Sequence, residues 1–138
     1  MSEAKVIGLG GVFIKFNEPK AMNKWYKEVL GLNVNDYGIL FGFNHGGGSR
    51  AFLQLGTFEQ STDYFGSEKQ QVMLNFRVQN LIDLSKQLRE KSVQIVDEIE
   101  SYEYGKFLHI NDPEGNRIEL WEPNDEFFAK TETFQDMH

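Results

Sequence analysis

Charged and polar side chains that could do chemistry stand at alternate positions in several otherwise apolar stretches. Glu119 is the most distinctive, because it lies between Ile118 and Leu120 in a segment that favours a strand. A carboxylate there can serve as a general base in a desolvated site. Alternatively, it can form an ion pair with Lys15 or Arg77. Burying a lone carboxylate is costly, so we expect a partner and favour the ion pair.

A histidine and two amides fall near this carboxylate. By strand parity, His109, Gln54 and Asn75 share a face with Glu119 and could together form a metal site of an unfamiliar kind. For a single histidine on a strand we favour a structural role. We therefore expect His109 to be hydrogen-bonded to Glu119 or to the backbone.

Composition excludes several other kinds of site. The chain has 138 residues and no cysteine, which excludes disulfides, thiolate metal sites, iron–sulfur clusters and cysteine nucleophiles. Its 14 Lys and Arg against 21 Asp and Glu give a net charge of −7, so nucleic acid and anionic membranes are not expected partners. No apolar run could span a bilayer, and the N-terminus does not resemble a signal peptide. We expect a cytoplasmic protein.

Two halves of the chain show the same order of predicted elements, which indicates an internal repeat. In the first half, apolar spacing predicts a strand, a helix and three strands at 11–16, 19–30, 32–36, 38–43 and 50–55. In the second half it predicts the same series at 71–78, 81–88, 93–98, 105–111 and 116–122. Residues 45–49 and 112–116 are matching turns.

Local signals mark the ends of the helices. Pro19 is suited to the first position of the first helix, Gly31 to its end, and Asn80 to the cap of the second. The first helix carries an apolar stripe that includes Trp25 and Tyr26. We expect this aromatic pair in the core rather than on the surface as a stacking platform.

These elements predict one α+β domain over residues 1–138. Its expected parts are a first module at about 6–57, a linker at 57–70, a second module at about 71–123 and a C-terminal tail at 124–138. The tail contains Phe127, Phe128 and Phe134, so we expect it to dock. Docking on its own chain and docking on a partner are both open.

Strand alternation assigns the residues of the sheet to two faces. One face is apolar and suits the packing of helices. The other is mixed and carries Gly11, Phe13, Lys15, Phe52, Gln54, Met73, Asn75, Arg77, His109, Glu119 and Trp121. It is too apolar for open solvent and too polar for a plain core, which favours the wall of a ligand cleft. The alternative is that Lys15 and Arg77 extend to water at the strand ends.

Three segments resemble the vicinal oxygen chelate superfamily, which includes glyoxalase I, bleomycin-resistance proteins, fosfomycin-resistance enzymes and extradiol dioxygenases. They are FIKFNEP at 13–19, WY at 25–26 followed by VLGL at 29–32, and DPEGNRIELW at 112–121. The resemblance covers about residues 6–123 and implies two βαβββ modules whose sheets curl around a shared cleft, with the helices outside. It also implies a homodimer.

In enzymes of this family a divalent metal in the cleft is held by the first strand of each module and the last strand of the second. Those positions fall on Gly11, Met73 and Glu119. Glycine has no side-chain donor, and a thioether is a poor ligand for Mg, Mn or Zn. One carboxylate does not supply the three or more ligands of a stable site. We therefore expect no cofactor, with a divalent metal as the alternative.

Three functions remain open for the cleft. The first is a metal-free, glyoxalase- or bleomycin-resistance-like protein that binds a small molecule through Phe13, Lys15, Phe52, Gln54, Met73, Asn75, Arg77, His109 and Trp121. The second is a lyase or isomerase of glyoxalase type that uses a divalent metal or Glu119 as its base. The third is an interaction module whose cleft is filled by its own side chains.

Overall fold

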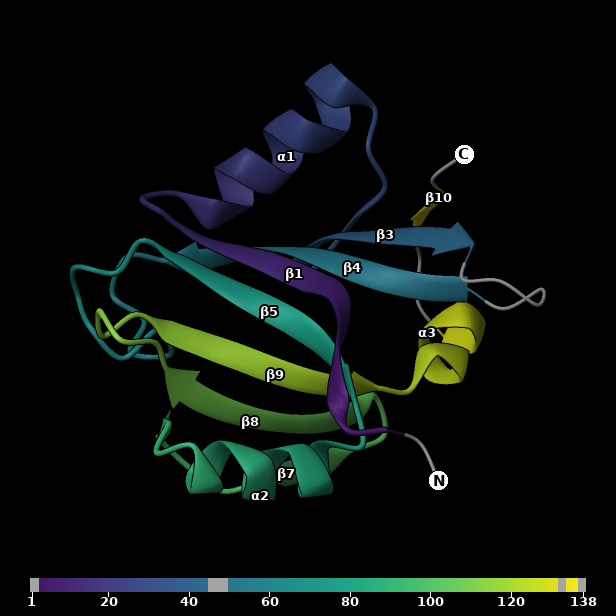
Figure 1. Cartoon of the computed structure of the whole chain (residues 1–138). Coiled ribbons are helices and arrows are strands. Elements are labelled where there is room, and N and C mark those ends of the chain that lie inside the picture. The colour runs from purple at the N-terminus through teal and green to yellow at the C-terminus, as the bar shows by residue number, and fades with distance from the viewer. Residues whose placement is uncertain (1–2, 45–49, 132–133, 137–138) are drawn as a thin grey trace.

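Figure 1 shows a computed structural model of the chain, which describes residues 3–44, 50–131 and 134–136. The turn predicted at 45–49 lies outside the described residues. The first module contains β1 (Lys5–Phe16), α1 (Pro19–Leu30), β2 (Val34–Asn35), β3 (Gly38–Asn44) and β4 (Arg50–Glu59). The second contains β5 (Val72–Gln79), α2 (Leu81–Glu90), β6 (Gln94–Ile95), β7 (Glu100–Tyr102), β8 (Gly105–Asn111) and β9 (Arg117–Pro123). α3 (Asp125–Thr131) and β10 (Gln135–Asp136) follow.

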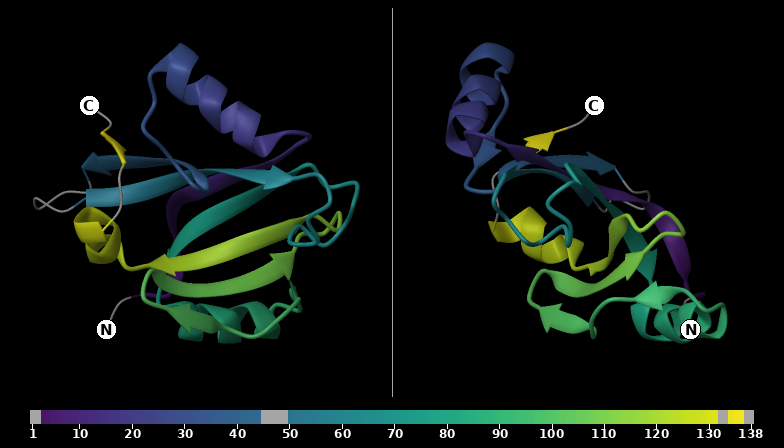
Figure 2. Two further views of the ribbon diagram at one scale, coloured as in Figure 1. Left: turned by 180° about the vertical axis from the view of Figure 1, so that it is seen from behind. Right: turned by 90° about the vertical axis from the view of Figure 1, so that its left-hand side faces the viewer.

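The strands form one curled, unclosed sheet in the order β10-β3-β4-β1-β5-β9-β8-β6, which confirms the predicted α+β fold class (Figure 2). β1 and β5 pair antiparallel at its centre, and each pairs in parallel with the last strand of its own module, β4 or β9. Several strands differ from the prediction. β1 already begins at Lys5, and β4 continues to Glu59. The strands expected at 32–36 and 93–98 are each only two residues long, and β7 was not predicted.

The core of the second module lies between α2 and the sheet. Its buried residues are Val78, Leu81, Leu84, Leu108 and Leu120. Asn80 caps α2 as predicted, because its side chain accepts a hydrogen bond from the backbone N–H of Asp83. This cap fixes the start of the helix where the chain leaves β5.

The first helix differs from its counterpart. α1 begins at Pro19 and ends at Gly31, which has the left-handed φ of 71° that favours glycine. No residue of α1 is buried, and Trp25 is 46% exposed, so the expected core position of the Trp25–Tyr26 pair is wrong. The helix leans away from the sheet (Figure 1). Apolar spacing identifies which side of a helix is apolar, but it does not determine how closely the sheet approaches.

Two segments cover the concave side of the sheet, one that precedes the second module in the sequence and one that follows it. α3 lies inside the curve of the strands (Figure 2), and the segment between β4 and β5 crosses the opposite end (Figure 1). Among the described residues, no helix is long and apolar enough to cross a membrane.

Candidate functional site

The mixed face identified in the sequence is the concave face of the sheet, and most of it is packed. Its buried members are Gly11, Phe13, Lys15, Phe52, Met73, Asn75, Arg77, His109, Glu119 and Trp121. Gln54 is half-buried, and its side-chain amide donates to the carbonyl of Leu55. These residues therefore do not form an open cleft along their whole length, because the chain itself covers much of this face.

The described part of the C-terminal tail fills one end of the concave face. The ring of Phe52 lies 5.7 Å from Phe128 and 5.0 Å from Phe134, centroid to centroid. Trp121 meets Phe128 edge-on at 5.6 Å. The tail therefore docks on its own chain, the first of the two alternatives left open by the sequence.

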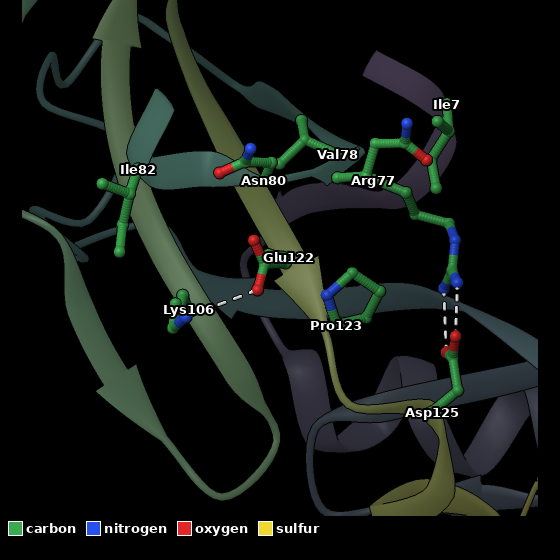
Figure 3. A pocket seen from close by; sticks show the side chains of 10 residues that line it. Ile7, Arg77, Val78, Asn80, Ile82, Lys106, Glu122, Pro123 and Asp125 are labelled. Carbon is green, nitrogen blue, oxygen red and sulfur yellow. Dashed lines mark hydrogen bonds and ion pairs between the residues drawn. The ribbon is translucent and has the colours of Figure 1, made fainter. Parts of the chain in front are cut away.

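Arg77 anchors this docking. Its guanidinium donates from Nη1 to Asp125 Oδ1 at 3.0 Å and from Nη2 to Asp125 Oδ2 at 2.5 Å (Figure 3), and Nη1 also donates to the Phe52 carbonyl at 3.0 Å. The paired hydrogen bonds are the geometry that an arginine favours with a carboxylate. The expected ion pair between Arg77 and Glu119 is therefore wrong.

The linker fills the other end. Lys15 donates from Nζ to the Ser67 carbonyl at 3.1 Å and lies over the ring of Phe65, 5.3 Å from its centroid. Phe13, Met73 and Phe65 form a buried cluster there. Lys15 is thus satisfied by linker carbonyls, and its expected pairing with Glu119 is also wrong.

Glu119 is held instead by neutral donors and a histidine. Asn75 donates from Nδ2 to Glu119 Oε1 at 2.6 Å, and the Tyr64 hydroxyl donates to Oε2. His109 Nε2 lies 2.8 Å from the same Oε2. The hydrogen bond expected between His109 and Glu119 is present, and the carboxylate, which is 1% exposed, has a partner on each oxygen.

His109 connects this buried carboxylate to a second one. Its Nδ1 lies 2.6 Å from Asp97 Oδ2. Both ring nitrogens face carboxylate oxygens, an arrangement in which the protonated ring can donate to both. Burial lowers the pKa of His109, but the hydrogen bonds and charges of Glu119 and Asp97 outweigh it, so the pKa lies above its usual value.

Tyr64 was not identified from the sequence as a site residue. Burial and the Glu119 carboxylate raise the pKa of its hydroxyl, so that it remains a hydrogen-bond donor. Asp97 was likewise missed. Tyr64 stands in a polar linker, where strand alternation carries no signal. Asp97 falls within the strand predicted at 93–98, of which only Gln94–Ile95 forms.

The metal positions implied by the resemblance do not fit a metal. A Cβ at Gly11 would lie 2.7 Å from the Phe13 ring and 2.9 Å from the Gln54 carbonyl, so no ligand side chain fits there. Met73 is fully buried among aromatic rings. Asn75 Oδ1 is buried without a hydrogen-bond partner, but one amide oxygen is not a ligand set. In the described ranges, no group of three His, Asp or Glu side chains is arranged to hold an ion.

A cavity of about 220 Å³ remains on this side of the sheet, and His109 and Tyr64 reach it. Its other lining residues are Asp97, Glu100, Tyr102, Tyr104 and Phe107. A larger groove of about 480 Å³ runs beside the start of α2 (Figure 3). Its charged groups already have partners: Arg77 with Asp125, and Glu122 with Lys106 and the Leu81 N–H. The smaller cavity is the better candidate site, because His109 and Tyr64, which line it, belong to the buried polar network around Glu119.

Solved structures share this fold. Methylmalonyl-CoA epimerase from Mycobacterium tuberculosis is 24% identical with a TM-score of 0.61, over 94% of this chain and 96% of that chain. A glyoxalase/bleomycin resistance protein/dioxygenase superfamily member from Vibrio splendidus 12B01 is 14% identical with a TM-score of 0.53, over 87% and 99%. A catechol 2,3-dioxygenase is 15% identical with a TM-score of 0.56, over 98% of this chain and 48% of that chain.

These identities establish a common fold and leave the activity open. Comparison with curated proteins found no match. The family model of the glyoxalase/bleomycin resistance protein/dioxygenase superfamily matches residues 9–120, which includes the strands and helices of both modules apart from the ends of β1 and β9. The chain belongs to the glyoxalase/bleomycin resistance protein/dioxygenase superfamily.

Proposed function

We propose that the chain binds a small molecule without a metal, in the cavity beside His109. One observation carries this proposal. The linker and α3 fill the two ends of the concave face, whereas the cavity of about 220 Å³ between Tyr64 and the β7–β8 hairpin stays open. Ligand sites are typically concave and aromatic with a few placed polar groups, and this cavity has that character.

The first test concerns metal. The protein is purified without chelator, and bound Mn, Ni, Zn and Fe are quantified per chain for the wild type and for Glu119→Ala. We expect far less than one ion per chain in both, since Gly11 and Met73 supply no hard donor. Near-stoichiometric metal in the wild type that disappears in the variant would contradict the proposal.

The second test concerns binding. Saturation-transfer NMR with a mixture of small neutral, anionic and cationic fragments is compared between the wild type, Tyr104→Leu and Tyr26→Leu. We expect fragments to bind the wild type and Tyr26→Leu, and to be weakened by Tyr104→Leu, because only Tyr104 lines the cavity. Absence of any bound fragment would contradict the proposal.

A proton-transferring isomerase is the second candidate. It is favoured by the hydrogen bond between His109, which lines the cavity, and Glu119, which lies behind it. In this role Nδ1 of His109 would leave Asp97 to exchange a proton with a substrate, while Glu119 would continue to hold Nε2 and position the ring. Deuterium incorporation into methylmalonyl-CoA in D₂O tests it, since one structural neighbour acts on that thioester. We expect His109→Gln to abolish any incorporation; a wild type that incorporates none argues against this candidate for that substrate.

We also propose that two copies associate, as the family resemblance implies. The apolar stripe of α1 leaves Trp25 46% and Val29 59% exposed, and an exposed apolar surface favours association. Sedimentation velocity should show a dimer that Trp25→Ser weakens. A wild type that is monomeric at all concentrations contradicts this. The cytoplasmic location stays a prediction.

A further inference from the structure

We infer that the cavity beside His109 accepts a small organic cation with an alkylated ammonium group. This inference rests on the proposed binding function and specifies its ligand class. Three independent features of the cavity carry it: its aromatic walls, its charge and its size.

The walls are aromatic on several sides. Tyr102 and Tyr104 stack with their ring centroids 5.2 Å apart and an interplanar angle of 5°. Phe107 stands at 62° to Tyr104 with a centroid separation of 5.6 Å, and Tyr64 lines the cavity from the linker. Aromatic rings that line a cavity at different angles can present their electron-rich faces to a cation, and alkylated ammonium groups are bound in this way.

The charge of the cavity is negative. Asp97 and Glu100 line it, and its described lining residues include no Lys or Arg. The His109 ring is already held between Asp97 and Glu119. Even when His109 is protonated, its one positive charge against three carboxylates leaves a net negative site, which attracts a cation and repels an anion.

The cavity is small, and the backbone fixes the hairpin on one side of it. At about 220 Å³, it falls below the roughly 300–1,000 Å³ of sites for drug-sized ligands. The Tyr104 carbonyl accepts hydrogen bonds from Trp121 Nε1 at 3.0 Å and from the Asn124 N–H at 3.2 Å. At Gly105, where φ is 136°, a Cβ would lie 2.4 Å from the Glu122 carbonyl. The tight hairpin therefore holds Tyr104 at the cavity.

Choline, its neutral isostere 3,3-dimethylbutan-1-ol and the anion 3,3-dimethylbutanoate are the probes. Binding to the full chain is measured by titration in ¹H–¹⁵N NMR spectra. We expect choline to bind at least about tenfold more tightly than the alcohol, and the anion not to bind. The three probes share one apolar shape, so the comparison isolates the effect of charge.

Two matched variants locate the interaction. Glu100→Gln should weaken choline binding severalfold, because Glu100 lines the cavity. Glu103→Gln removes the same charge from the same hairpin but not from the cavity wall, and it should change little. Dispersed spectra like those of the wild type show that each variant is folded.

The outcomes separate this inference from the proposed function. Equal affinity for choline and the alcohol, or no effect of Glu100→Gln, overturns the cation inference while binding in the cavity stands. If neutral or anionic fragments bind and choline does not, the cation inference is likewise overturned while binding in the cavity stands. If neither the probes nor any fragment of the earlier mixture binds, both the inference and the proposed function fail.

Discussion

His109 Nε2 lies 2.8 Å from Glu119 Oε2, and the two residues are direct partners across the β8–β9 pair. The geometry of the sheet therefore brings the imidazole and the carboxylate together, while Asp97 fixes the other ring nitrogen. This contact is the centre of the buried polar network, and it makes the stability of the protein depend on pH.

The first prediction concerns this pH dependence. The pKa of His109 is raised in the folded state, so its stabilising contribution is fully present below its unfolded pKa of about 6.5. The contribution is lost as the pH rises through the folded pKa. Urea unfolding of the wild type and His109→Gln should show a difference in free energy that is largest near pH 6 and shrinks by pH 9. A difference that grows with pH would contradict the assignment.

The second prediction concerns Glu119. Glu119→Ala leaves Tyr64, Asn75 and His109 without their shared acceptor, and it should lower the free energy of unfolding by roughly 3–5 kcal/mol. Glu119→Gln should cost less, because its amide oxygen still accepts. Glu114→Ala, in the exposed turn, should cost within about 0.5 kcal/mol. Equal losses for the two alanine variants in urea unfolding would mean that the network does not stabilise the fold.

The third prediction concerns the anchor of α3. Asp125→Asn removes the charge partner of Arg77, whose side chain is 3% exposed, so α3 should dock less firmly. We expect faster cleavage after Lys130 by trypsin and a loss of roughly 3 kcal/mol in stability. Glu126→Gln, the adjacent and exposed acidic residue, is the control and should behave like the wild type. Unchanged proteolysis of Asp125→Asn would show that the aromatic contacts alone hold the helix.

The fourth prediction compares two glycines of β1. A Cβ at Gly10 would lie 2.3 Å from Asn75 Oδ1 and 2.9 Å from Trp121, whereas a Cβ at Gly8 would meet nothing within 4 Å. Gly10→Ala should therefore lower stability by roughly 1–3 kcal/mol through overpacking. Gly8→Ala should be within about 0.5 kcal/mol of the wild type. Thermal unfolding of both variants distinguishes crowding of the concave face from a general effect of alanine in this strand.

The local pattern of the sequence determined the elements and the faces. Period-two alternation placed Phe13, Asn75, His109 and Glu119 on one side of the sheet, and the repeat of strands and helices predicted the fold class. Helix ends were equally local, because Pro19, Gly31 and Asn80 act through their own backbone and side chains. These features depend on neighbours within a few residues, so one sequence was enough to find them.

Only the tertiary structure decided which groups meet. The partners of Glu119 come from the linker and from two other strands. Lys15 is bonded by the linker, and the carboxylate partner of Arg77 comes from α3. The exposed position of Trp25 on α1 was likewise decided by how the helix sits on the sheet. Alternation specifies the side to which a residue points, but the choice among several oppositely charged or hydrogen-bonding groups depends on distances set by long-range packing.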